Sequence, residues 1–349
     1  MKKLLILGGS CYIVPLIKKA HDLGISVITC DYLPNNIAHR YSDAYENISV
    51  IDKDSVLKMA MNRNIDGVLS FACDPGVVTA AYVAEKMGLP FQTSYEVTCM
   101  LQNKGLFREF LRKNRFNVPN SKSYSSVEGA LKDIENYDFP VIVKPVDSAG
   151  SKGVTKVEIS DNLKDAVKKA FYYSISGSII VEDYLELEGF QNSTDPFVVN
   201  GNFAFYPFAD NDFDKKSNNT FVPTEVIFPC TMEQKYINEL KEETTRLLKL
   251  LDVKTGIFNI ESRLCKNGKT YLMEVTPRGG GNKIAELQDY AFGTACVENE
   301  IRKAVGMELI PFTSKKIDGC WIGYAIHSVD QEGILDHIDI DPIIEKKIY

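Results

Sequence analysis

The chain has 349 residues, and its 40 Lys and Arg against 47 Asp and Glu give a formal charge of −7 with the four His neutral. At about 100–200 residues per domain, this length predicts two or three domains. The 44% of hydrophobic residues are enough for a large buried core. The acidic balance, without a dense block of Lys and Arg, disfavours a nucleic-acid surface or an anionic-membrane surface, since both need a field of positive charge.

No stretch of the sequence predicts a membrane span or an exported protein. No apolar run approaches the roughly 18–20 residues that cross a bilayer. The residues Leu4–Leu7 imitate the start of a signal peptide, but they stop at Gly8-Gly9-Ser10 and no cleavage site follows, so we expect a first strand there. The eight Cys form no CxxC pair, which indicates reduced thiols and a cytoplasmic location.

Residues 1–95 alternate short β-rich runs with helical stretches, the pattern of a parallel sheet covered by helices. The Gly-Gly-Ser turn after the first run lacks the spacing of a dinucleotide fingerprint, so it is weak evidence for NAD. The predicted strands are Leu4–Leu7, Val27–Cys30, Ile48–Ile51 and Val68–Phe71, and the predicted helices begin near Tyr12, Asp54 and Pro75.

Four further segments follow this domain. Residues 96–120 read as a linker with a helix at Lys104–Asn114, and residues 121–185 as a small α+β unit with a Gly/Ser loop at 147–153. Residues 186–310 contain predicted strands, a mobile loop at Asp210–Thr220, a helix at Met232–Leu251, a hairpin joined at Asn267-Gly268 and one helical stretch from Asn282 to Val305. The tail, residues 311–349, reads as β-rich and carries His327, which we expect to be structural.

A lysine at the end of a buried strand precedes the Gly/Ser loop. Lys144 follows the apolar run Val141–Val143, and the loop after it is rich in small residues. A lysine in this place is often simply solvated. Together with the free backbone N–H groups of a small-residue loop, however, its ammonium group offers a binding site for a phosphate. We expect Lys144 to reach the solvent of a cleft.

Two acidic features point to a nucleotide and a metal. The run Glu182-Asp183-Tyr184-Leu185 ends a strand, and by itself it reads equally well as a strand entering a turn. Glu261 and Glu274 are carboxylates in runs that otherwise read as buried strands of one hairpin. Burying two unpaired carboxylates side by side is costly unless a cation lies between them. Carboxylate and phosphate oxygens are the ligands that Mg²⁺ prefers.

These elements, in this order, resemble the ATP-grasp superfamily, to which D-alanine:D-alanine ligase, biotin carboxylase and the large subunit of carbamoyl phosphate synthetase belong. The resemblance covers about residues 1–310. It implies an α/β protein with the ATP-grasp fold: an N-terminal Rossmann-like, or pre-ATP-grasp, parallel-sheet domain, followed by two α+β subdomains that enclose ATP.

The resemblance implies a role for each motif. Lys104 and Lys144 would bind phosphates, and Arg278 would lie against the transferred phosphoryl group, with Lys144 and Arg278 acting in catalysis. The metal, Mg²⁺ or in its place Mn²⁺, would be bound by Glu261, Glu274 and, more weakly, Thr276. The remaining nucleotide-binding residues would be the lid Ser148, Gly150, Ser151, Lys152 and Gly153, the adenine hinge Glu182, Asp183, Tyr184 and Leu185, and Gln191 at the ribose.

Three positions depart from the family pattern: Asn103 stands in place of Asp, Gln191 in place of Glu, and Thr276 in place of Asn. An uncharged Gln191 puts nucleotide affinity in doubt, though its amide oxygen can still accept a hydrogen bond. Asp74 is a weaker candidate for the substrate site, because Asp before Pro is also a common helix cap.

Enzymes of this superfamily mostly activate a carboxylate with ATP and let an amine attack the acylphosphate. The resemblance therefore implies an ATP-dependent carboxylate–amine ligase with a small-molecule carboxylate and an amine as substrates, and it leaves a homodimer open. A bicarbonate-dependent carboxylating ligase of the purine-synthesis type and a nucleotide-binding regulator without catalysis remain as alternatives. We expect the substrate between the N-terminal domain, the Asp210–Thr220 loop and the glycines 279–281.

Overall fold

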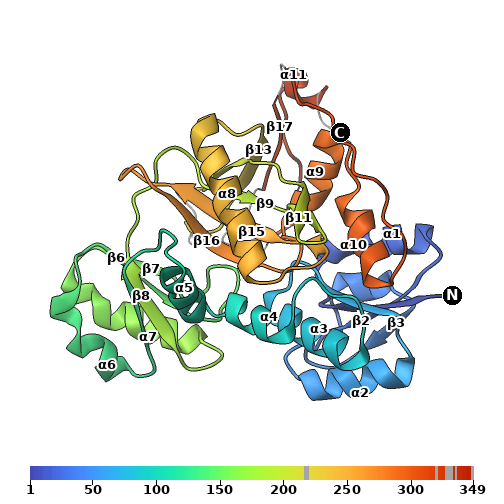
Figure 1. Cartoon of the computed structure of the whole chain (residues 1–349), viewed down its shortest axis with the longest axis horizontal. Coiled ribbons are helices and arrows are strands. Elements are labelled where there is room, and N and C mark those ends of the chain that lie inside the picture. The colour runs from blue at the N-terminus through green and yellow to red at the C-terminus, as the bar shows by residue number, and fades with distance from the viewer. Residues whose placement is uncertain (216–219, 319–320, 327–332, 335, 347–349) are drawn as a thin grey trace.

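The computed structural model describes residues 1–215, 220–318, 321–326, 333–334 and 336–346 (Figure 1). His327 and residues 216–219 of the predicted loop lie outside this part of the chain. The N-terminal domain and the small α+β unit lie at opposite ends of the molecule, with the C-terminal subdomain above them (Figure 1). In the part of the chain described, no helix is long and apolar enough to cross a bilayer.

A four-stranded parallel sheet forms the N-terminal domain, with strand order β3-β2-β1-β4. One apolar core lies between the sheet and the first helix, and a second lies under the other two helices. The elements are β1 (Lys3–Leu7), α1 (Val14–Asp22), β2 (Ser26–Cys30), β3 (Ala44–Glu46), α2 (Lys53–Arg63), β4 (Gly67–Ser70) and α3 (Asp74–Met87), with short 3₁₀ turns η1 (Cys11–Ile13) and η2 (Ile37–Arg40).

The predicted strand at Ile48–Ile51 is wrong. The third strand lies earlier, at Ala44–Glu46, and residues 48–51 lead into α2. Val50 is buried against the helices, and its carbonyl accepts a hydrogen bond from the Thr79 hydroxyl at 2.5 Å instead of a strand partner. The apolar run therefore reflects packing under a loop rather than sheet pairing.

Two consecutive helices connect the N-terminal domain to the rest. The sequence predicts only the second of them. α4 (Tyr95–Gln102) is capped by Ser94, whose hydroxyl accepts from the Val97 N–H. α5 (Lys104–Lys113) is capped by Asn103, whose side chain accepts from the Leu106 N–H at 3.1 Å. Asn103 therefore serves as a helix cap, and Lys104 is the first residue of α5.

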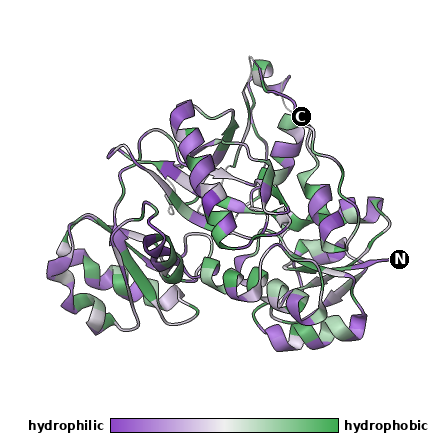
Figure 2. Cartoon of the chain, viewed as in Figure 1, coloured by the Kyte–Doolittle hydropathy of each residue, from purple (hydrophilic) through white to green (hydrophobic). Residues whose placement is uncertain are grey.

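The small α+β unit is an antiparallel sheet of order β5-β8-β6-β7 covered by two helices. Its central strands β6 and β8 are buried, and their apolar stretches are green in Figure 2. The elements are β5 (Ser121–Tyr124), α6 (Val127–Lys132), η3 (Ile134–Asn136), β6 (Val141–Pro145), β7 (Thr155–Val157), η4 (Ser160–Asn162), α7 (Leu163–Tyr173) and β8 (Ile179–Asp183).

The C-terminal subdomain contains short antiparallel sheets with orders β16-β15-β9, β11-β10-β14 and β12-β13-β17. Its core lies under α8, whose outer side is purple in Figure 2. The elements are β9 (Asn192–Thr194), β10 (Phe197–Val199), β11 (Asn202–Phe205), β12 (Asp210–Asp212), β13 (Glu225–Phe228), α8 (Gln234–Leu250), β14 (Gly256–Ile257), β15 (Asn259–Leu264), β16 (Thr270–Thr276), α9 (Ile284–Phe292), α10 (Cys296–Ala304), β17 (Ile322–Ala325) and α11 (Pro342–Glu345).

Two predicted segments differ here. The stretch Asn282–Val305 is two helices, because Gly293 with φ +66° ends α9 in the left-handed conformation. The loop Asp210–Thr220 begins as a strand, β12, which pairs with β13, and β13 pairs on its other side with the tail strand β17. A polar strand gives no apolar alternation, which is why the sequence does not reveal it.

Candidate functional site

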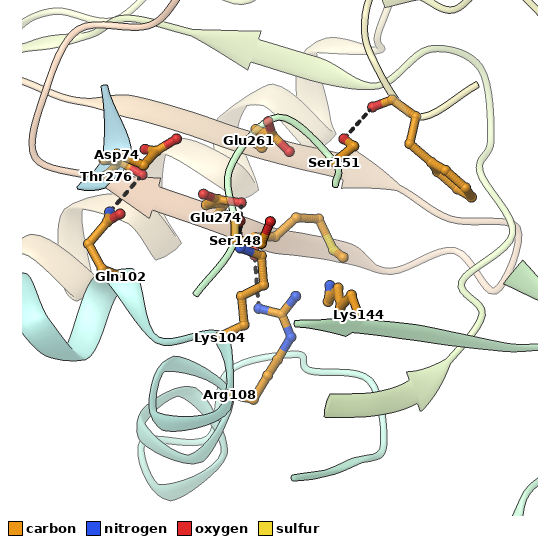
Figure 3. A network of polar contacts seen from close by, with 12 residues as sticks. Asp74, Gln102, Lys104, Arg108, Lys144, Ser148, Ser151, Glu261, Glu274 and Thr276 are labelled. Carbon is orange, nitrogen blue, oxygen red and sulfur yellow. Dashed lines mark hydrogen bonds and ion pairs between the residues drawn. The ribbon is translucent and has the colours of Figure 1, made fainter. Parts of the chain in front are cut away.

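A buried ion triad of Glu182, Arg108 and Lys144 links the small α+β unit to α5, and Figure 3 shows Arg108 and Lys144. The Glu182 carboxylate accepts from Arg108 Nε at 3.1 Å and from the Lys144 ammonium group. Arg108 also donates from Nη1 to the Met273 carbonyl at 2.9 Å. Lys144 and Glu182 are neighbours across β6 and β8, and Arg108 comes from the buried face of α5. The triad therefore ties three parts of the chain together.

The charges of the triad control each other's protonation. The two cations hold the Glu182 pKa at about 2 although burial acts to raise it. Burial lowers the Lys144 pKa to about 8, against the opposing pull of Glu182. Lys144 is only 9% exposed. The expectation that Lys144 reaches solvent is therefore wrong: an acidic neighbour on the next strand lets the ammonium group be buried.

Glu261 and Glu274 are direct partners across β15 and β16 (Figure 3). Burial and the charge of Glu274 together raise the Glu261 pKa. Around them, Gln191 Nε2 donates to Glu261 at 3.4 Å and Lys104 Nζ lies 3.8 Å from Glu274. Two carboxylates side by side repel each other unless a cation is shared between them. The structure thus brings the predicted pair together, through a register shift between Glu261 and Ser262.

Lys104 also contacts the predicted lid. Its ammonium group donates to the Ser148 carbonyl at 3.2 Å, and its backbone N–H donates to the Val146 carbonyl at 2.9 Å. The base of the lid is anchored by Asp147, which accepts from the Ile175 and Ser176 N–H groups. The first lid residues therefore lie beside the acidic pair.

The far end of the lid turns back toward β6. Gly150, Ser151 and Gly153 all have positive φ, and a Cβ on Gly153 would lie 2.9 Å from Pro145. The Ser151 hydroxyl donates to the Phe221 carbonyl at 2.9 Å, whereas Lys152 is exposed. The loop thus spans from the small α+β unit to the C-terminal subdomain.

The backbone at the predicted hinge leaves one donor free. Asp183 and Tyr184 donate their N–H groups to the carbonyls of residues 120 and 140, and Lys156 lies over the Tyr184 ring at 4.0 Å. Within the described residues, the Leu185 N–H has no hydrogen-bond partner. A planar ligand edge with an acceptor could occupy this position.

Gln191 and Thr276 are engaged by other side chains. Gln191 Oε1 accepts from Arg263, while its Nε2 donates to Glu261. The buried Thr276 hydroxyl accepts from Gln102 Nε2 at 3.3 Å and lies on the same face of β16 as Glu274, two residues away. Their contacts with ribose and with a metal stay predictions.

Arg278 is held by a residue of the N-terminal domain. Asp74, at the start of α3, accepts from Arg278 Nε at 2.7 Å and from Nη2, while Nη1 donates to the Gly279 carbonyl at 2.8 Å. The Asp74 carboxylate raises the Arg278 pKa against the effect of burial. Gly279 lies so close to the Phe71 ring that only a residue without a Cβ fits: a Cβ there would be 2.2 Å from the ring.

Sequence reasoning missed Arg108 and Asp195. Asp195 is fully buried, and it accepts from Asn259 Nδ2 at 2.8 Å and from the Gly280 N–H at 2.6 Å. Burial raises its pKa to about 7. Nothing in the local pattern identifies Asp195, because its partners lie far along the chain. For Arg108 the sequence offered one signal, a charged residue on the otherwise apolar face of α5.

The residues present fit a nucleotide with a divalent metal ion. The Glu261 and Glu274 pair supplies hard anionic oxygens, and Lys104 supplies a cation next to them. Among the described residues there is no cluster of three His, Cys, Asp or Glu side chains that could bind a metal. A metal at the pair would therefore need oxygens from a further group, which phosphates would provide.

Comparison with known proteins agrees with this arrangement. Residues 137–286 match the family model of the ATP-grasp domain. The large chain of carbamoyl phosphate synthase from Thermotoga sp. (strain RQ2) is 24% identical over 260 residues, which are 73% of this chain and 23% of that protein. The N-terminal section of the carbamoyl phosphate synthase large chain from Aquifex aeolicus is 24% identical over 292 residues, which are 82% of this chain and 48% of that protein. The chain thus spans about a quarter to a half of these relatives.

Solved structures share the fold. The L-amino acid ligase from Bacillus licheniformis superposes with a TM-score of 0.77 at 21% identity, over 99% of this chain and 84% of that one. Phosphoribosylglycinamide synthetase from Anaerococcus prevotii gives a TM-score of 0.71 at 23% identity, over 90% of this chain and 78% of that one. Together with the facing carboxylates, the lid and the buried lysine, the family match identifies residues 137–286 as an ATP-grasp domain.

Proposed function

We propose that this protein is an ATP-dependent ligase that activates a small carboxylate as an acylphosphate, which an amine then attacks with release of phosphate. The observation that carries the proposal is the facing pair Glu261 and Glu274 with Lys104 at 3.8 Å. Phosphoryl transfer depends mainly on positioning and on positive charge near the developing negative oxygens. A paired acidic site beside a lysine suits that task.

In this proposal the adenine lies against the hinge and accepts a hydrogen bond from the free Leu185 N–H. The triphosphate then runs along the lid, toward Lys104 and the acidic pair. Lys144, which is bound to Glu182 without nucleotide, supplies a second cation near the phosphates. The lid backbone between Ser148 and Gly153 covers the phosphates, since its small residues leave N–H groups accessible.

Glu261 and Glu274 would hold Mg²⁺, which would neutralise phosphate charge when bound. Arg278 would lie against the acyl phosphate, because Asp74 and the Gly279 carbonyl fix its guanidinium at the glycine-rich turn. These residues position and stabilise charge, so the reaction needs no protein nucleophile.

Relatives support a ligase but differ in substrate. They include carbamoyl phosphate synthase, an L-amino acid ligase and phosphoribosylglycinamide synthetase. N5-carboxyaminoimidazole ribonucleotide synthetases share the fold as well, so a carboxylating reaction is the natural competitor. The two reactions differ in whether ATP turnover requires bicarbonate.

The test measures ADP formation by the full chain with Mg·ATP and a panel of carboxylates, each with pooled amines, in bicarbonate-depleted buffer. We expect one carboxylate to raise ADP formation well above the background. Calorimetry with a non-hydrolysable ATP analogue should show binding that weakens without Mg²⁺. Absence of nucleotide binding would contradict the proposal, and turnover that appears only with bicarbonate would favour the carboxylating ligase.

A further inference from the structure

Several polar side chains of the C-terminal subdomain are buried without a hydrogen-bond partner. Both carboxylate oxygens of Glu286, the hydroxyl of Tyr324 and both polar side-chain atoms of Asn211 have none within the described part of the chain. Asn211 is only 1% exposed. An unpaired buried polar group is costly, and an unpaired carboxylate is costlier still. Such groups are expected where a ligand supplies the missing partner.

Strand register places these groups on one side of the sheet. Asn211 is opposite Val226 on β13, and Val226 is opposite Tyr324 on β17, so the Asn211 and Tyr324 side chains share a face. α9, which carries Glu286, packs against β17, and Figure 1 shows β13, β17 and α9 close together. Val226 belongs to the same apolar cluster as Ile284 of α9.

Electrostatics connects the same groups. Burial raises the Tyr324 pKa, and the charge of Asp195, the phenol of Tyr12 and the charge of Glu286 raise it further. Burial raises the Glu286 pKa as well, while the charge of Lys283 opposes this. Tyr324, Glu286 and Asp195 are therefore close enough to interact, although no hydrogen bond joins them.

This cluster holds more acidic groups than cations. Asp195 and Glu286 contribute two carboxylates, whereas Lys283 is exposed to solvent. Arg278 also acts on Asp195, but its guanidinium is already paired with Asp74. The group that best satisfies the cluster is a cation with several N–H donors.

The cluster also borders the proposed reaction centre. Asp195 accepts from the Gly280 N–H, two residues after Arg278. A Cβ on Gly281 would lie 3.9 Å from Ala72 and 4.0 Å from Tyr12, so the N-terminal domain meets the glycine-rich turn here. A small ligand between these elements could reach both Arg278 and the cluster.

We propose that Glu286 and Tyr324 bind the ammonium group of the substrate, which makes the substrate class a small acid that carries a primary amine, such as an amino acid. An ammonium group has three N–H donors and no acceptor, which matches a carboxylate and a phenol oxygen. The free amide of Asn211 is left for another polar group of the same ligand. This inference rests on the proposed ligase function and adds its substrate class.

The experiment compares two substrate pools with the full chain and Mg·ATP. One pool contains the twenty L-amino acids, and the other contains the corresponding carboxylic acids without the amino group. Hydroxylamine is added to both as a neutral nucleophile, so that an acylphosphate is captured whatever the natural amine is. We expect ADP formation from the amino-acid pool to exceed that from the des-amino pool at least tenfold.

Variants assign the effect to the cluster. Glu286→Gln should lower ADP formation from the amino-acid pool at least tenfold, and Tyr324→Phe should lower it less, while the affinity for the ATP analogue stays unchanged. Glu242→Gln, on the exposed side of α8, is the matched control and should behave as wild type. The melting temperature of ligand-free Glu286→Gln should equal or exceed that of wild type, because an unpaired buried charge is removed.

The outcomes separate the two proposals. Loss of binding to the ATP analogue by the wild-type chain would overturn the ligase function. Normal ATP binding with equal rates on both pools, or a Glu286→Gln variant as active as Glu242→Gln, would overturn the ammonium site alone. ATP binding with no ADP formation from either pool would contradict both.

Discussion

Replacing Glu182 with Gln tests the buried triad most directly. In the wild-type chain one carboxylate compensates the positive charges of Arg108 and Lys144. The variant keeps the shape of the side chain but leaves two buried cations without an anion. Removing one partner of a buried ion pair costs about 3–5 kcal/mol, because the remaining charge is uncompensated.

The pKa of Glu182 gives the same magnitude. It is lowered to about 2 from the ordinary value of 4.5, and each unit corresponds to about 1.4 kcal/mol, so the ionised carboxylate adds roughly 3 kcal/mol to stability at neutral pH. In the variant, Lys144 loses the carboxylate that keeps its pKa as high as about 8. It can then release its proton, which places the expected loss at the low end of the range, about 3 kcal/mol.

The assay is urea denaturation at pH 7 without nucleotide, followed by far-ultraviolet circular dichroism. Glu158→Gln is the control, since Glu158 forms an exposed ion pair with Lys156 at 2.8 Å and should cost at most about 1 kcal/mol. Because the folded pKa of Glu182 is below its unfolded value, its contribution is present above pH 4.5 and is lost as the pH falls toward 2. The difference between wild type and Glu182→Gln should shrink over that range. A loss at pH 7 no larger than that of Glu158→Gln would refute the triad as a stabilising unit.

Other predictions concern the reaction. Lys144→Met should lower turnover roughly 10²–10³-fold with less effect on the KM for ATP, because it removes a cation whose contact with the phosphates strengthens in the transition state. Turnover within about twofold of wild type would exclude that role. Glu274→Gln should leave the ligand-free stability within about 1 kcal/mol of wild type, since relief of the repulsion with Glu261 offsets the loss of the partly exposed ion pair with Lys104. The same variant should greatly weaken Mg²⁺-dependent ATP binding in calorimetry. A large loss of stability with intact turnover would argue against the metal site. Asp74→Asn should reduce kcat at least tenfold by loosening Arg278 while nucleotide affinity is unchanged, and unaltered kcat would show that the pairing with Asp74 does not position the guanidinium.

The elements and motifs that depend on neighbouring residues were predictable from the sequence. The apolar run Val141–Val143 before the Gly/Ser loop, and the hairpin joined at Asn267-Gly268, lie as the sequence predicts. The hairpin places Glu261 and Glu274 on neighbouring strands, but their direct pairing also needs a register shift between Glu261 and Ser262, which the sequence does not reveal. The ATP-grasp resemblance rests on this local information.

Contacts between distant parts of the chain were decided only by the tertiary structure. Arg108 and Asp74 reach Glu182 and Arg278 across separations of 74 and 204 residues, and no local pattern encodes such partners. Burial then sets the chemistry: Lys144 was expected in solvent, yet a carboxylate on the next strand allows it to be enclosed. The sequence determined which charges the chain carries and where along the chain they stand. The packing of the domains determined which charges are paired and which, like Glu286, are buried without a hydrogen-bond partner in the described part of the chain, because desolvation and long-range contacts exist only once the chain is folded.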